Sequence, residues 1–283
     1  ADAHAGAVEH FEFADINSER KRRRWGCWYG RRGWLDRCCS DYSLLMDFSI
    51  FDRHQKIALQ VSGGKDSLAI LYLLRPYWDR LTVYWTNPGN PFPETVELMA
   101  RIRKMVPRFK EIQGFQPAIV ALDGWPSDVV PISHTSDGHF ALGERQFRVQ
   151  GRFNCCVRSL MIPMHQAMLN DEVTCIIRGR RADEADKSPA RPGSVIDGIE
   201  FVFPLWDWSA DEVLSFLSRV GVDVPKFYAY GTASFDCMDC TAWWGDGLAR
   251  YLKGEHPAQY NEYKRRVLLI KRAVSEQMSN CEV

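Results

Sequence analysis

The chain has 283 residues, of which 46% are hydrophobic and 25% are charged, and its 36 basic residues balance 36 acidic ones. These values fit a globular protein with one large domain and exclude a fibrous or largely disordered chain, while the zero net charge gives no general attraction for nucleic acid. No apolar run approaches the roughly 20 residues that span a membrane. The nine cysteines favour a reducing compartment, so we expect a cytoplasmic protein with no membrane partner.

A basic and aromatic arm comes first, and we place it at residues 1–53. Residues 20–37 contain eight lysines and arginines against one acid, interleaved with three tryptophans and one tyrosine. Aromatic rings stack on bases and arginines pair with phosphates, so the arm suits a nucleic-acid partner. An arm whose tryptophans pack on its own domain and whose arginines are solvated fits the same residues equally well.

From Lys56 onward the sequence alternates between short apolar runs and helical periods. The runs predict strands at residues 57–61, 81–85, 118–122 and 174–178. The intervening periods predict helices at residues 67–74, 94–105 and 157–169. Repeated strand–helix units imply a mainly parallel sheet with helices on both faces, so we expect an α/β fold of three layers over residues 54–245.

The last part of the chain is expected to be helical. Ser209 and Glu212 have the spacing of a capping box, and Val213, Phe216 and Leu217 follow as an apolar stripe. Beyond this helix we separate a helical C-terminal tail at residues 246–283.

A glycine turn joins the first predicted strand to its helix, with the sequence Ser62-Gly63-Gly64-Lys65-Asp66-Ser67. A strand that turns into a helix leaves unpaired N–H groups where the helix dipole is positive, which is a site for phosphate. The glycines allow close approach, the serines and the lysine add donors, and Asp66 can hold a magnesium ion. An ordinary tight turn is the alternative. The combination of all six residues between a strand and a helix favours phosphate binding. The turn is neither a Walker A loop nor a GxGxxG motif.

These six residues resemble the PP-loop of the ATP pyrophosphatases, which cleave ATP between its α- and β-phosphates. Three further segments resemble the phosphoadenosine phosphosulfate (PAPS) reductase family of that superfamily: Phe92-Pro93-Glu94-Thr95, Arg178-Gly179-Arg180-Arg181 with Glu184 and Arg191, and Pro204-Leu205-Trp206-Asp207-Trp208 with Glu212-Val213. Ala185 replaces a serine of the family pattern, and Glu212 replaces an aspartate. The resemblance implies an adenine nucleotide alpha-hydrolase-like fold. It also implies nucleotide binding by residues 62–67 and Gly179, with Lys65, Asp66, Arg180 and Arg181 in catalysis.

Two pairs of cysteines, Cys155-Cys156 and Cys237-Met238-Asp239-Cys240, can supply four thiolates to one inorganic centre. The spacing alone allows zinc or an iron–sulfur cluster. Adjacent cysteines bind a single ion awkwardly because successive side chains diverge, whereas different iron atoms of a cluster can take them. With Pro163 and Thr241, the pattern resembles the [4Fe-4S] motif of the cluster-bearing adenosine phosphosulfate (APS) reductase branch. This resemblance implies a [4Fe-4S] cluster on Cys155, Cys156, Cys237 and Cys240.

The other cysteines show no such pattern. Cys27, Cys38 and Cys39 match no standard ligand spacing, even with His54 added, and we expect them to be unligated. Cys175 lies in a predicted strand and is expected to be a small core residue. Cys281 lies in the tail, where a mobile thiol can serve as a nucleophile.

Three hypotheses of function follow from the resemblance. Sulfonucleotide reductases usually have a degenerate loop and a C-terminal Glu-Cys-Gly-Leu/Ile-His motif, whereas this chain keeps Gly63-Gly64-Lys65-Asp66 and ends in Asn280-Cys281-Glu282-Val283. The first hypothesis is therefore an enzyme that uses ATP and Mg²⁺ to adenylate a substrate, such as nucleic acid, for sulfur transfer, with a sulfur or electron donor protein as partner. The PP-loop proteins of tRNA thiolation and DNA phosphorothioation are similar in this sense. The second is a PAPS or APS reductase releasing sulfite, and the third is a nucleotide-binding module without turnover.

Overall fold

The structure is a computed structural model that describes residues 47–184 and 190–281. Most of the predicted arm lies outside these residues, as do Cys27, Cys38, Cys39 and Ala185. Within the described residues, no helix combines the length and the apolar character that crossing a membrane requires.

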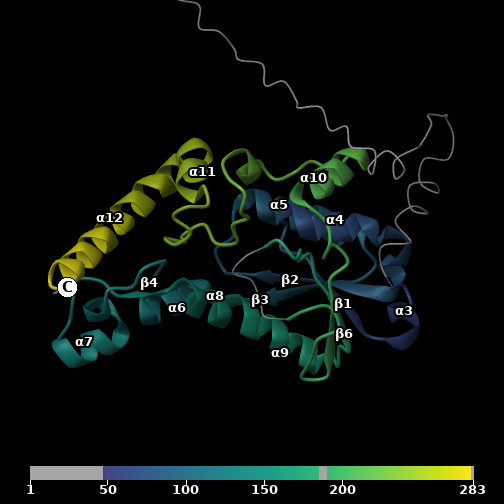
Figure 1. Ribbon diagram of the computed structural model, residues 1–283, viewed down its shortest axis with the longest axis horizontal. Coiled ribbons are helices and arrows are strands. Elements are labelled where there is room, and N and C mark those ends of the chain that lie inside the picture. The colour runs from purple at the N-terminus through teal and green to yellow at the C-terminus, as the bar shows by residue number, and fades with distance from the viewer. Residues whose placement is uncertain (1–46, 185–189, 282–283) are drawn as a thin grey trace, which may run out of the picture. The chain divides into compact units, whose positions relative to one another are not determined.

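The centre of the fold is a six-stranded sheet in the order β3-β2-β1-β6-β8-β7 (Figure 1). Its strands are β1 (Ile57–Gln60), β2 (Leu81–Asn87), β3 (Phe109–Gln113), β6 (Cys175–Ile177), β7 (Val195–Ile196) and β8 (Ile199–Val202). All neighbouring pairs are parallel except β7 and β8, which are antiparallel. The predicted mainly parallel sheet is therefore confirmed. Parallel strands need crossover connections, and helices supply most of them here.

Helices cover both faces of this sheet (Figure 1). On one face lie α4 (Lys65–Leu73), α5 (Pro93–Met105) and α10 (Ala210–Arg219). On the other lie α6 (Gln116–Asp123), α8 (Arg152–Cys156), a π-helical turn (Val157–Met161) and α9 (Ile162–Asn170). The three-layer α/β fold is thus confirmed, and the capping box of Ser209 and Glu212 is present at the start of α10.

Shorter elements lie around these layers. A small parallel sheet is formed by β4 (Trp125–Ser127) and β5 (Val149–Gly151). The remaining short helices are α3 (Ile50–Arg53), α7 (Ser136–Leu142) and 3-10 turns at Arg75–Arg80, Ile132–His134 and Lys226–Ala229. The chain then forms α11 (Leu248–Glu255) and α12 (Pro257–Ser279), which confirms the helical C-terminal tail.

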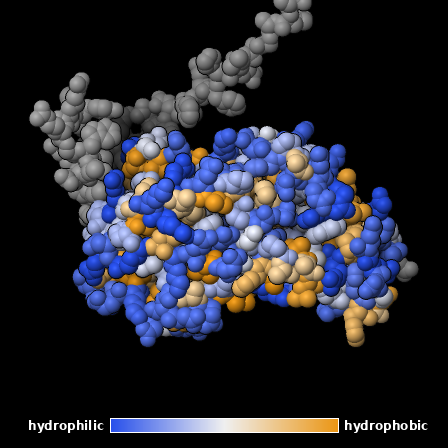
Figure 2. Space-filling model, turned by 180° about the vertical axis from the view of Figure 1, so that it is seen from behind, coloured by the Kyte–Doolittle hydropathy of each residue, from blue (hydrophilic) through white to orange (hydrophobic). Residues whose placement is uncertain are grey.

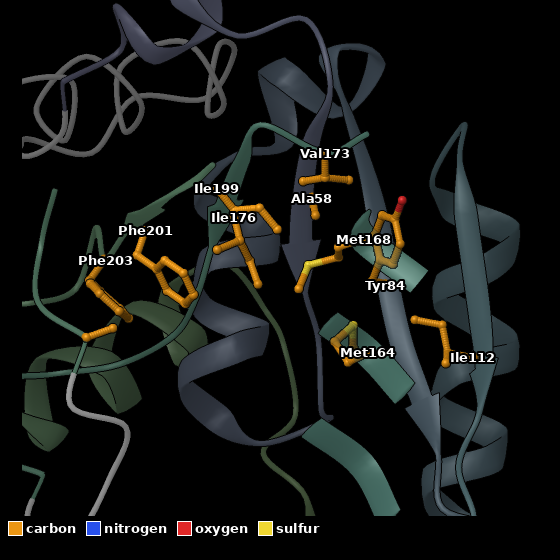
Figure 3. Close-up of a cluster of buried hydrophobic side chains, with 11 residues drawn as sticks. Ala58, Tyr84, Ile112, Met164, Met168, Val173, Ile176, Ile199, Phe201 and Phe203 are labelled. Carbon is orange, nitrogen blue, oxygen red and sulfur yellow. The ribbon is translucent and has the colours of Figure 1, made fainter. Parts of the chain in front are cut away.

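One core cluster lies between the sheet and α9 (Figure 3). Ala58 of β1 and Ile176 of β6 are buried beneath Met164 and Met168, which stand one helical turn apart on α9. Each fully buried side chain of this size stabilises the fold by roughly 1.5–3 kcal/mol relative to an exposed one. Cys175 is also fully buried, as expected for a small core residue.

A second core ties α11 and α12 to the rest of the domain. Its centre is Tyr251 of α11, whose ring contacts Phe92, Phe227 and Phe235 at centroid distances of 5.2, 6.0 and 6.1 Å. Phe92 immediately precedes α5, so this core fixes the C-terminal helices against the start of that helix.

One predicted strand is wrong. Residues 118–122, expected as the third strand, lie in α6, and the third strand of the chain is Phe109–Gln113. The strand was missed because it is an edge strand whose side chains are mostly polar and only partly buried. The apolar run was misread because Pro117 opens a helix at this point, and a short apolar run fits a helix as well as a strand.

Candidate functional site

The glycine loop (residues 62–67) connects β1 to α4 at the carboxyl end of the strand. Gly63 has φ +90°, in the left-handed region that favours glycine, and a Cβ there would lie 3.2 Å from the Cε of Met99 on α5. Gly64 is the extended N-cap of α4, and the Ser67 hydroxyl donates to its carbonyl at 2.8 Å. The loop therefore turns sharply and places the positive end of a nine-residue helix at the end of the central strand.

Three charged side chains are buried together at this turn. Lys65, Asp66 and Arg181 are only 5%, 9% and 6% exposed. The Lys65 Nζ lies 2.6 Å from Asp66 Oδ2, and the Arg181 Nε lies 2.9 Å from Asp66 Oδ1. Arg181 also pairs with Asp183 at 3.1 Å. The tertiary structure thus brings together three of the four predicted catalytic residues, although Arg181 lies more than a hundred positions beyond Lys65 and Asp66 in the chain.

This triad has unfilled hydrogen-bonding capacity. Asp66 Oδ1 and Arg181 Nε form an ion pair at 2.9 Å, but these two fully buried atoms make no hydrogen bond with each other or with another group. Buried polar atoms normally find partners, so orphaned ones mark a place where a ligand group or ion can bind. Both carboxylate oxygens of Asp66 face cations in this arrangement, so binding Mg²⁺ there would require one of these ion pairs to open.

Gly179, just after β6, touches the loop from the neighbouring strand. A Cβ at Gly179 would lie 2.7 Å from both the Asp66 carbonyl carbon and the Ser67 nitrogen, closer than real Cβ atoms approach backbone. Glycine is therefore required for β6 to lie directly against the first turn of α4. Gly179, which is predicted to bind the nucleotide, therefore lies directly against the glycine loop.

An arginine cluster (Arg178, Arg180 and Arg191) lies next to Gly179. Burial lowers the pKa of Arg178, and the charge of Arg180 lowers it further. Burial and the charge of Arg191 lower the pKa of Arg180 in the same way. Arg180 and Arg191 both lie over the ring of Trp206, at 5.5 and 5.8 Å from its centroid. Guanidinium groups that repel one another bind an anion favourably, since the anion relieves the repulsion.

Tyr228 contacts the glycine loop from a distant part of the chain, and the sequence analysis did not identify it. Its phenolic oxygen accepts a hydrogen bond from the Lys65 N–H at 2.9 Å, and its ring lies 5.5 Å from the Lys65 Nζ. A Cβ at Gly64 would lie 3.0 Å from this oxygen and 3.1 Å from the Ser234 hydroxyl. No motif marks Tyr228, which is 163 positions from Lys65.

The four predicted cysteine ligands come from two separate segments. Cys155 and Cys156 end α8, and the π-helical turn Val157–Met161 follows them directly. Such turns are rare and often occur at functional sites. Cys237 and Cys240 belong to the cysteine loop (residues 237–240), which pairs with the segment before α5 through a bridge between Pro91 and Cys237.

The two cysteine pairs lie within electrostatic reach of each other. Burial raises the pKa of Cys237 and of Cys240, and the charges of Cys155 and Cys156 raise both further. Burial likewise raises the pKa of Cys156 to about 12. Buried thiols of this kind become thiolates only when a cation accompanies them.

A single metal ion is not accommodated as the side chains stand. In the described ranges 47–184 and 190–281, no three His, Cys, Asp or Glu side chains are close enough to hold one ion. In a cubane cluster each thiolate binds a different iron atom, so its four ligands stand farther apart than those of one tetrahedral ion. The adjacent pair Cys155-Cys156 and the pair Cys237 and Cys240 are a donor set of the kind that can bind a cluster.

Polar contacts hold the cysteine loop in place. Asp239, between the two cysteines, accepts hydrogen bonds from Asn90 and, at 3.3 Å, from Gln259. Residues just beyond the loop are fixed by Asp128, whose carboxylate accepts from the backbone N–H groups of Trp243 and Trp244 at 3.0 and 2.8 Å. Sequence reasoning did not identify these positioning residues.

The remaining predicted candidates do not join the site. His54 is bound to Glu200 and Thr174 at the other end of the sheet strands. Cys281 is exposed and follows α12. That helix begins next to the cysteine loop, through Gln259, and its 23 residues carry the chain about 34 Å away at 1.5 Å per residue. Its far end contacts the Ile132–His134 turn, where Gln277 accepts from the Ile132 N–H. Cys281 is therefore not positioned to attack a ligand in the glycine loop.

Comparison with known families gives one match over most of the chain. The family model described as the phosphoadenosine phosphosulfate reductase domain matches residues 56–243. Two relatives are named adenosine 5'-phosphosulfate reductase. That of Burkholderia cepacia is 23% identical over 201 residues, 68% of this chain and 72% of the relative. That of Allochromatium vinosum is 23% identical over 188 residues, 65% of this chain and 68% of the relative.

Two solved structures are also similar. A phosphoadenylyl-sulfate (PAPS) reductase from Candida auris, in a phosphate complex, aligns with a TM-score of 0.45 and 16% identity over 64% of this chain and 80% of its own. The U34-tRNA thiolase NcsA from Methanococcus maripaludis, with its [4Fe-4S] cluster, aligns with a TM-score of 0.44 and 16% identity over 83% of this chain and 80% of its own.

Proposed function

The chain belongs to the phosphoadenosine phosphosulfate reductase domain family, and from that premise we propose that it is an enzyme that uses ATP to activate an acceptor for sulfur transfer. An acceptor oxygen attacks the α-phosphorus, the bond to the bridging oxygen of the β-phosphate breaks, and pyrophosphate leaves. A sulfur nucleophile at the oxidation level of sulfide then displaces AMP, which keeps the acceptor oxygen. No net oxidation or reduction is needed.

The protein residues act mainly by positioning and by charge neutralisation. The amide groups at the start of α4 receive the departing pyrophosphate, with Lys65 and Arg181 beside it. The arginine cluster faces the same end of the sheet through Gly179 and supplies positive charge for the α-phosphate. Asp66 holds Lys65 and Arg181 in place until an Mg²⁺-bound nucleotide competes for its carboxylate.

A [4Fe-4S] cluster would be held by Cys155, Cys156, Cys237 and Cys240. When bound, such a cluster supplies a site that can carry sulfur or tune the charge around the substrate. The chain's own contribution is to bury Cys155, to bury the other three cysteines in part, and to fix the cysteine loop and the residues after it through Asp239 and Asp128.

One observation carries the proposal: the segment that leads into the cysteine loop also contacts the glycine loop. Tyr228 and Ser234 touch the glycine loop, and Cys237 follows Ser234 by three positions. Phe227 and Phe235 anchor this segment in the second core. A nucleotide at Lys65 and a cluster at Cys237 would therefore share one wall, which suits two successive steps on one acceptor.

A sulfonucleotide reductase is the second candidate, and the names of the curated relatives favour it. In that reaction a thiol attacks the sulfonyl sulfur and sulfite is released. Since α12 carries Cys281 away from the glycine loop, the attacking thiol would have to come from another protein or a small thiol. A binding module without turnover is the third candidate.

The test uses anaerobically reconstituted full-length protein mixed separately with ATP, APS and PAPS. AMP and pyrophosphate formed from ATP support the proposal, sulfite formed from APS or PAPS supports the reductase, and tight binding without products supports the module. Lys65→Ala should lower the rate of pyrophosphate release from ATP by roughly a hundredfold, since it removes one charge-stabilising group. Arg101→Ala, on the exposed side of α5, is the control and should leave this rate unchanged. In the same protein, Cys155→Ser should remove the broad absorbance near roughly 400 nm that is typical of iron–sulfur clusters.

A further inference from the structure

A cavity lies outside the functional site described above. It has a volume of about 550 Å³ and is bordered by β4, by α7 and by the residues that lead into β5. Its lining includes three aromatic residues, Trp125, Phe140 and Phe147, together with Arg145 and Arg148. None of the residues of the glycine loop or of the arginine cluster takes part, so the cavity is a separate feature.

The aromatic rings of this cavity differ in how far they are open to a ligand. The rings of Trp125 and Phe147 are stacked on each other, with centroids 5.1 Å apart and planes 13° from parallel. Their outer faces are covered as well, because the guanidinium groups of Arg265 and Arg266 lie over Trp125 and the His134 ring lies 4.6 Å from Phe147. Phe140 on α7 stands at the rim and is 96% exposed. The α7 end of the molecule, on the right in Figure 2, is otherwise mainly hydrophilic, with isolated hydrophobic groups among hydrophilic ones. An exposed ring among charged side chains suits a flat aromatic ligand better than a large apolar protein interface.

The charged side chains around the cavity are mostly arginines. Arg145 and Arg148 line the cavity with Glu144. Arg265 and Arg266 of α12 lie over the Trp125 ring, at 5.5 and 5.4 Å from its centroid. Both pair with the carboxylate of Glu262, and the charge of Glu276 acts on His134 beside Phe147, so the four arginines are opposed by three glutamates. Stacking surfaces flanked by guanidinium groups are the recognition elements for single-stranded nucleic acid.

The cavity is linked to the cysteine loop by one hydrogen bond. Pro126, next to Trp125 on β4, accepts a hydrogen bond from the buried Thr241 hydroxyl at 2.6 Å. Thr241 immediately follows Cys240. The wall of the cavity that β4 forms is therefore attached to the segment that carries the cysteine loop.

We propose that this cavity docks a single-stranded segment of nucleic acid, with a base stacked on the exposed ring of Phe140 and with phosphates paired to Arg145 and Arg148. The inference rests on the proposed function only in making the docked strand the source of the acceptor. It is distinct from any contact made by the basic arm, because it concerns residues of β4, of α7 and of the segment that leads into β5. Docking itself requires neither ATP nor a cluster.

The test measures binding of fluorescent oligonucleotides of roughly 12 nucleotides to the full-length protein without ATP, using oligo-uridine, oligo-deoxythymidine and a matched duplex. We expect single strands to bind more tightly than the duplex and Phe140→Ala to weaken single-strand binding by roughly tenfold. Arg145→Ala should reduce the slope of the logarithm of the binding constant against the logarithm of salt concentration by about one, because one phosphate contact is lost. Leu142→Ala removes a 60% exposed side chain of the same helix outside the cavity and serves as the matched control.

A second measurement locates the contact. Ultraviolet crosslinking of the bound strand, followed by mass spectrometry, should mark peptides that contain Trp125, Phe140 or Phe147. Preference for uridine identifies RNA as the strand, and preference for deoxythymidine identifies DNA. Unchanged binding by Phe140→Ala, equal binding of duplex and single strand, or crosslinks confined to other peptides would overturn the inference. If the protein releases pyrophosphate from ATP but does not bind single strands, this inference alone is wrong. If it binds single strands but does not turn over ATP, the proposed function alone is wrong.

Discussion

The phenolic oxygen of Tyr228 accepts the backbone N–H of Lys65, the first residue of α4, at 2.9 Å. This is the position where an oxygen of a bound phosphate would accept at a helix N-terminus. The tyrosine hydroxyl therefore satisfies an N–H group that the ligand would otherwise take, and ligand binding must displace it.

Tyr228→Phe should consequently bind pyrophosphate more tightly than the wild type, by roughly two- to tenfold, because the competing hydrogen bond of the free protein is removed. Isothermal titration calorimetry measures the affinity. Tyr230→Phe, which removes a hydroxyl bound to Glu255 instead, is the matched control. Weaker binding by Tyr228→Phe would show that the hydroxyl contacts the ligand rather than competing with it.

Gly179→Ala should destabilise the protein and impair nucleotide binding. The added methyl group would stand 2.7 Å from backbone atoms of Asp66 and Ser67, and overpacking of this kind costs roughly 1–3 kcal/mol. Gly245→Ala, where a Cβ meets nothing within 4 Å, should leave the free energy of unfolding nearly unchanged. Urea unfolding of both variants makes the comparison, and equal midpoints would contradict the close contact between β6 and α4.

Asp239→Ala should weaken retention of the metal centre while leaving the four cysteines intact. The carboxylate fixes the cysteine loop through Asn90 and Gln259, and loss of such outer contacts typically costs 10- to 100-fold in metal affinity. Iron content after challenge with a chelator is the readout. Asp246→Ala, in the loop before α11, is the control; equal iron loss in the two variants would argue against a positioning role for Asp239.

The stability of the edge of the sheet should depend on pH through Asp171. Burial acts to raise the pKa of this carboxyl, but hydrogen bonds from Lys110 and Tyr84 outweigh burial and hold the pKa below 3.8. A carboxyl whose folded pKa is depressed stabilises the fold above its unfolded pKa, and this contribution is lost as pH falls through the folded pKa.

Asp171→Asn should therefore be less stable than the wild type at pH 7, and the difference should shrink below about pH 4. Lys110→Met should give the same trend, because it removes the cation that pairs with Asp171 at 2.6 Å. Urea unfolding between about pH 3 and 7 records both profiles. A difference from the wild type that stays constant over this range would contradict the assignment.

Much of the fold was predictable from neighbouring residues. The strand at Ile57–Gln60, the turn at Gly63 and the helix from Lys65 follow from an apolar run, a residue that tolerates positive φ and a helical period. The capping box at Ser209 was predictable for the same reason, since both of its partners lie within one helical turn. Where the local signal was ambiguous, at residues 118–122, the prediction failed.

The sequence by itself determined which residues are candidates for the site: the glycine loop, Gly179, the arginines after it and the two cysteine pairs. Only the tertiary structure decided that Asp66 pairs with Arg181, that Tyr228 reaches Lys65 and that Cys281 is carried away from both. Local elements are set by interactions between near neighbours, which leave a period or a motif in the sequence. Contacts between residues far apart arise from how β6, the second core and α12 pack, and packing depends on shape and volume that no short motif records.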